Sequence, residues 1–209
     1  MTTKTQLVLT MEQLILLRKE FPLLALKHGI AEKMLSSNQL SISLDMAFDL
    51  GLSLEESLFI MGYLGLFKEL KSVALLAASR ARLYAKEFQK KSDTIFRNVT
   101  SHPQFIWYPA GELYESCAKV CMSIVAANTA EEAALHASLA SSYRGNPHQI
   151  DLDPVFVSAR YALCCAIRAA SPDVYSLNDN PDEIKGLAAD SERDLQRSNI
   201  LALTARTIK

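Results

Sequence analysis

The amino-acid sequence predicts an all-α protein, a single domain of about eight to ten helices packed as a bundle around one buried central helix. Alanine and leucine, both strong helix formers, dominate the 209-residue chain, whereas glycine and proline number only 7 each. Apolar residues recur every three or four positions, and alternating strand patterns are nearly absent. Segment 153–171 is apolar around almost its whole circumference, so we expect neighbouring helices to cover it on almost all sides.

Start and stop signals define the helices of the N-terminal half. Residues 1–9 form a loose or extended start, and one helix begins at Ser43 and ends at Gly51. The longest amphipathic pattern extends from residue 66 to about residue 89. Two further helix starts have capping-box spacing, namely Thr10 with Gln13 and Ser53 with Glu56.

Residues 92–110 interrupt this periodicity and form the longest irregular segment that the sequence predicts. Two helical halves of the domain would meet here. The segment contains Phe105, Trp107 and Tyr108, and aromatic residues on loops are typical of interface hot spots. We therefore predict that these three residues bind a partner. The alternative is that Trp107 folds back and fills the seam between the two halves.

The C-terminal half begins with a helix over residues 110–127. Thr129 with Glu132 is a third capping box, which predicts a separate helix ending at Gly145. The central helix follows, with Asp153 as its N-cap, and a last helix or helix pair completes the chain.

Arg160 and Arg168 are the charged exceptions on the central helix. Because arginine in an apolar helix needs partners, we expect both to form buried polar pairs with carboxylates of the last helix. The alternative is that both side chains extend to solvent. The candidate carboxylates are Asp190, Glu192 and Asp194.

Charge and hydropathy give no support to nucleic-acid binding, membrane binding or a membrane span. A net charge of −1 gives no argument for nucleic acid or for an anionic membrane as partner. The central helix is too short, and too interrupted by arginine, to span a bilayer. No signal peptide is evident, and all four cysteines lie in helical patterns, which fits the reducing cytoplasm.

The cysteines Cys117, Cys121, Cys164 and Cys165 could in principle hold zinc in a tetrahedron. The competing interpretation is that they pack as small core hydrophobes, since no histidine has zinc-finger spacing to them. We adopt the second interpretation and predict no metal and no cofactor. No catalytic residue is assigned, because the sequence has no phosphate loop, nucleophile elbow or paired catalytic carboxylates.

Residues 43–53 resemble the helix-turn-helix of DNA-binding repressors, with Ala47 and Gly51 at the spacing of that family. Glu55 and Glu56 stand where the recognition helix would approach phosphates, and like charges repel. We therefore predict a structural corner between two helices, with no nucleic-acid partner.

Two C-terminal stretches, residues 158–162 and residues 191–196, resemble the alanine-rich helical immunity proteins of bacterial polymorphic-toxin systems. Leu195 stands where that family typically carries tryptophan before the glutamine. The resemblance implies a non-enzymatic protein that binds a toxin. The sequence thus favours a soluble helical protein-interaction module, immunity-like or effector-like. The alternative is an enzyme or small-ligand-binding protein whose pocket is assembled from dispersed residues.

Overall fold

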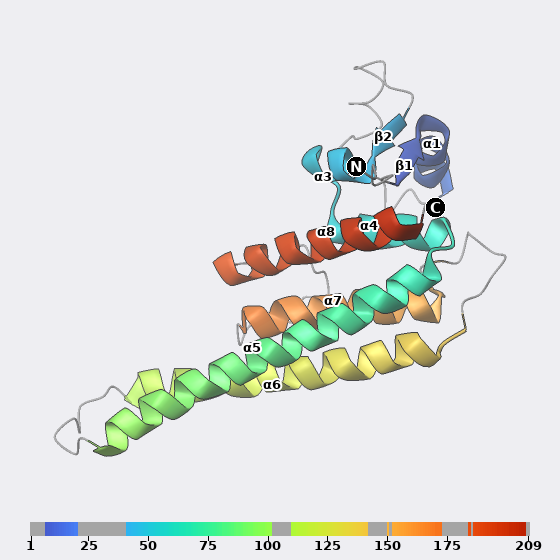
Figure 1. Cartoon of the computed structure of the whole chain (residues 1–209). Coiled ribbons are helices and arrows are strands. Elements are labelled where there is room, and N and C mark those ends of the chain that lie inside the picture. The colour runs from blue at the N-terminus through green and yellow to red at the C-terminus, as the bar shows by residue number, and fades with distance from the viewer. Residues whose placement is uncertain are drawn as a thin grey trace.

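The computed structural model describes residues 7–20, 41–101, 110–141, 150, 152–172, 184 and 186–207 (Figure 1). Within these ranges the chain is predominantly helical, which confirms the predicted fold class, and none of the helices is long and apolar enough to cross a membrane. The helices are α1 (Met11–Glu20), α3 (Leu44–Asp49), α4 (Leu54–Tyr63), α5 (Phe67–Ser101), α6 (Ala110–Leu139), α7 (Pro154–Ala170) and α8 (Leu187–Thr207).

The described ranges contain seven helices, not the predicted eight to ten, and two stretches differ from the predicted pattern of breaks. Residues 92–101 continue α5 as helix, although the sequence predicted an irregular segment there. Thr129 does not cap a new helix but lies inside α6, where its hydroxyl donates to the Val125 carbonyl at 2.8 Å. Neither stretch contains glycine or proline, so weak polar signals do not interrupt the helix.

The predicted central helix is α7, although one side of it is less covered than predicted, because Val157 and Tyr161 are exposed. Asp153 is its N-cap, and the Asp153 carboxylate accepts hydrogen bonds from the backbone N–H groups of Val155 (2.9 Å) and Phe156 (3.2 Å). Eleven of its 17 residues are buried. α5, α6 and α7 form the most extensively packed group of helices, and small side chains let them approach closely. Alanines at their contacts include Ala74, Ala77, Ala130, Ala134 and Ala162.

The N-terminal part of the chain meets this three-helix core through α4, which packs against α5 and α7. Strand β1 (Val8–Thr10) pairs antiparallel with β2 (Ser41–Ser43), a pairing between distant segments that the sequence did not reveal. α4 begins at the predicted capping box, in which Ser53 and Glu56 bond each other's backbone N–H. Residues 56–62 of α4 are all buried, so this helix cannot enter a DNA groove, and the corner is structural.

α8 packs against α7 and α5 and also contacts α3. Arg197 on α8 forms ion pairs with Asp45 (3.2 Å) and Asp49 (2.5 Å), and its guanidinium lies 5.1 Å from the centre of the Phe48 ring. These contacts tie the last helix to the N-terminal corner.

Candidate functional site

The most distinctive exposed feature is a two-helix arm, formed by residues 86–101 of α5 and 110–122 of α6 (Figure 1). α5 is about 50 Å long, whereas α7 is only about 25 Å long, so α5 continues well past the end of the core. Figure 1 shows the arm extending beyond α7 and α8. None of residues 86–97 or 114–122 is buried. Over these residues the arm therefore has a seam between its own two helices but no buried core.

One side of α5 carries exposed apolar and basic residues from the core out onto the arm. Leu76, Leu83 and Lys90 recur every seven residues, so they lie along one face of the helix. The Leu76 side chain is 39% exposed and that of Leu83 is 58% exposed. We call this surface the outer face of α5. Its members are Leu76, Leu83, Glu87, Lys90, Lys91 and Thr94.

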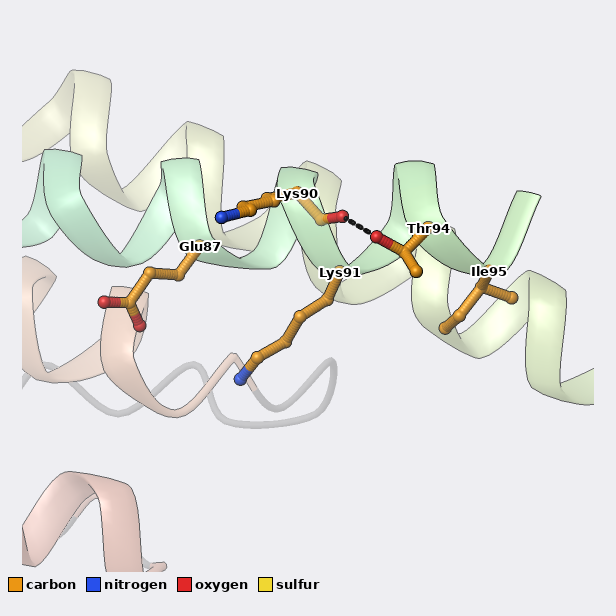
Figure 2. A pocket seen from close by; sticks show the side chains of 5 residues that line it. All are labelled: Glu87, Lys90, Lys91, Thr94 and Ile95. Carbon is orange, nitrogen blue, oxygen red and sulfur yellow. Dashed lines mark hydrogen bonds between the residues drawn. The ribbon is translucent and has the colours of Figure 1, made fainter. Parts of the chain in front are cut away.

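The outer end of this face borders a shallow hollow of about 580 Å³ (Figure 2). Its described lining comes from successive turns of α5, and Thr94 donates its hydroxyl to the Lys90 carbonyl at 2.9 Å. The Lys91 ammonium lies 5.6 Å from the centre of the Phe88 ring, a cation–π contact that leaves the ammonium exposed. The described lining residues are Glu87, Lys90, Lys91, Thr94 and Ile95.

The outer face of α5 lies in a basic stretch of a chain that is almost neutral overall. Residues 82–97 contain five basic and two acidic side chains, whereas the whole chain has a net charge of −1. Arg82 is paired with Glu131 of α6 at 3.0 Å, whereas Lys90 and Lys91 are exposed on the outer face and give it positive charge. This positive field attracts acidic groups.

A second group of polar residues is buried between α5 and α8. The Glu192 carboxylate is fully buried, and it accepts hydrogen bonds from Arg80 Nε at 2.8 Å and from Tyr84 Oη at 2.6 Å. Gln196 donates its side-chain amide to the same carboxylate at 2.5 Å. Arg80 Nη2 also donates to Tyr84 Oη at 2.8 Å. Each member thus satisfies the buried charge of Glu192.

The electrostatics of this cluster follow from its geometry. The hydrogen bond to Glu192 raises the pKa of Arg80, so the guanidinium stays charged. Burial, followed by the hydrogen bond to Glu192, raises the pKa of Tyr84 to about 12. An acid–base catalyst at neutral pH needs a pKa near 7, which neither group has. The cluster is suited to joining α8 to α5.

The predicted partner-binding residues Phe105, Trp107 and Tyr108 lie outside the described residues, in the connection between α5 and α6. Arg160 meets a carboxylate, but on α4 rather than on the last helix: its Nε lies 2.8 Å from Glu55 Oε1. The N–H is not directed at that oxygen, so the contact is an ion pair without a hydrogen bond. Arg168 is half-buried on α7.

The prediction that all four cysteines pack in the core is correct only for α7. Cys164 and Cys165 are buried there, whereas Cys117 and Cys121 are exposed on α6. The buried face of α6 is formed by alanines and by Ser123, whose hydroxyl donates to the Ala169 carbonyl at 2.9 Å. Among the residues that the structure describes, no three histidine, cysteine or acidic side chains lie close enough together to hold a metal ion.

Comparison with known proteins does not assign a family to the chain. No protein-family model matches it, and no curated protein or solved structure is significantly similar.

Sequence reasoning missed both the arm and the Glu192 cluster. The cluster joins residues more than one hundred positions apart, although Arg80 between buried alanines was a local sign that a carboxylate must face α5. The arm depends on the length of α5, which the sequence underestimated by ending the helix near residue 89.

Proposed function

We propose that this protein is a helical interaction module that binds a partner protein through the outer face of α5 and the adjoining arm. Its role is that of a cytoplasmic, immunity-like or effector-like binding protein without catalytic activity of its own. The observation that carries the proposal is the arm itself: two helices leave the core together, and no described residue at 86–97 or 114–122 is buried.

The composition of the exposed surface supports this proposal. Leu83 is 58% exposed, and Tyr114 on the arm and Val125 at its base are 78% and 59% exposed. Large apolar side chains that form one contiguous exposed surface mark protein–protein contacts. Tyrosine is also among the residue types that contribute most to interface affinity.

The alternative function, an enzyme or small-ligand binder, would use convergent polar groups around a cleft. The group that converges most closely in the described part of the chain is the Glu192 cluster. Its donors are directed at one buried carboxylate, which leaves that carboxylate poorly placed to meet a substrate. The geometry therefore supports binding by the surface over catalysis at this cluster.

Affinity purification from cells that naturally express the protein tests the proposal. Tagged wild type is compared with Leu83→Ser and Tyr114→Ser, and with Leu139→Ser as the matched control. Leu139 is 75% exposed but lies at the opposite end of α6 from the arm. We expect a stoichiometric partner that is retained by the control and lost from both variants. A partner retained equally by all four proteins would contradict the proposal.

A further inference from the structure

We propose that the segment recognised by the outer face of α5 is an acidic amphipathic helix of the partner protein. This inference rests on the proposed function and specifies the chemistry of the partner. Three properties of the outer face support it: its shape, its apolar residues and its charge.

The outer face presents a straight helical surface. Leu76 and Leu83 lie two turns apart, about 10 Å along the axis, and the hollow beside Ile95 lies about 18 Å beyond Leu83. A partner helix packing along α5 would place its own apolar residues at the same heptad spacing. An exposed helix face of this kind is suited to a helix and not to a flat domain surface.

The charges around these apolar positions specify the sign of the charge that the partner helix carries. Lys90 and Lys91 are both exposed at the hollow, and in Figure 2 the Lys91 side chain extends away from α5, with its ammonium unobstructed by the other labelled residues. Lys86 is exposed one turn earlier. Glutamates flanking the apolar stripe of a partner helix would meet these three lysines.

The same residues argue against nucleic acid as the occupant. Glu87 lines the hollow between the lysines, and beside Leu76 and Leu83 the two arginines, Arg80 and Arg82, are both paired with carboxylates. Nucleic-acid sites are much more uniformly basic, because affinity comes mainly from phosphate contacts. A surface with exposed leucines at one end and exposed lysines at the other matches an amphipathic acidic helix better.

Fluorescence anisotropy with model peptides tests the inference on the full chain. The probe is a labelled peptide of about 20 residues with leucine on one helical face and glutamate elsewhere, long enough to form a helix when bound. The control peptides carry lysine in place of glutamate, or the same composition in scrambled order. We expect the glutamate peptide to bind at least about tenfold more tightly than either control. Its affinity should fall as the salt concentration rises from about 50 to about 200 mM.

Matched variants assign the binding to the outer face. Lys91→Glu should lower the affinity for the glutamate peptide by about fivefold or more, and Leu83→Ser should lower it by a similar factor. Lys68→Glu makes the same change of charge at an exposed position near the start of α5 and should have little effect. Circular dichroism of each variant shows whether its fold is retained.

Three results would overturn the inference. The first is equal binding of the glutamate and lysine peptides, or equal effects of Lys91→Glu and Lys68→Glu. The second is displacement of the peptide by single-stranded DNA at low concentration. The third is self-association that Lys91→Glu abolishes, which would make a second copy the occupant. If the peptide fails but the native partner is still lost from Leu83→Ser, the proposed function stands and only the acidic helix is excluded.

Discussion

Arg80→Met should destabilise the protein strongly, because it removes the principal partner of a fully buried carboxylate. The substitution keeps the length and apolar stem of the side chain but deletes the guanidinium that donates to both oxygens of Glu192. Tyr84 and Gln196 continue to donate to the carboxylate, so its desolvation is only partly offset. The effect therefore tests whether this cluster holds α8 against α5.

The magnitude follows from burial. Breaking a buried ion pair by removing one partner costs about 3–5 kcal/mol, and the two remaining donors place the expected loss near the lower limit, at about 3 kcal/mol. Arg82→Met is the matched control on the same helix. The Arg82 side chain is 63% exposed and pairs with a partly exposed Glu131, so its loss should cost about 0–1 kcal/mol.

Urea denaturation followed by circular dichroism measures both changes in the free energy of unfolding. Glu192→Met and the double variant complete a double-mutant cycle, in which we expect favourable coupling of more than about 1 kcal/mol between Arg80 and Glu192. The reasoning is refuted if Arg80→Met costs no more than Arg82→Met, or if the two single changes are additive.

Three further outcomes follow from the structure. The pKa of Tyr84 is raised to about 12, so the stabilisation that its neutral hydroxyl gives the fold is complete below about pH 10 and is lost as pH rises toward about 12. The free energy of unfolding of wild type should therefore fall over this range relative to that of Tyr84→Phe. Parallel curves of unfolding free energy against pH would contradict the assignment. Leu163→Asp places an unpaired charge at a fully buried position of α7 and should abolish cooperative unfolding, whereas a melting curve close to wild type would refute the central position of that helix. In the folded protein a thiol reagent should modify the two α6 cysteines and spare the two on α7 until denaturant is added; equal rates would show that the assigned burial is wrong.

Local signals in the sequence were sufficient to predict much of the fold. Asp153 and Pro154 defined the start of α7, and Ser53 with Glu56 defined the start of α4, because capping depends on neighbouring residues only. The pairing of β1 with β2 could not be predicted in this way, since it joins segments that are remote in sequence. The buried face of α6 was misassigned because its core is built from alanine, while the larger Val125 faces solvent.

The candidate site was less accessible to sequence reasoning than the fold. The outer face of α5 is exposed because no neighbouring helix covers it, and this depends on how far α7 and α8 extend beside α5. A pattern of leucines at seven-residue spacing was present, but the sequence alone could not distinguish an exposed face from a buried one. The predicted aromatic contacts at Phe105, Trp107 and Tyr108 remain a prediction.

Site-specific photocross-linking in cells that express the protein tests the central claim most directly. A photoreactive amino acid is placed at Thr94 on the outer face of α5, or at Leu139 at the far end of α6, both of which are exposed. The account predicts a discrete adduct with one protein from position 94, its loss when Lys91→Glu is added, and no such adduct from position 139. An adduct from position 139 alone, or none from position 94 while the native partner still co-purifies, would place the binding surface elsewhere.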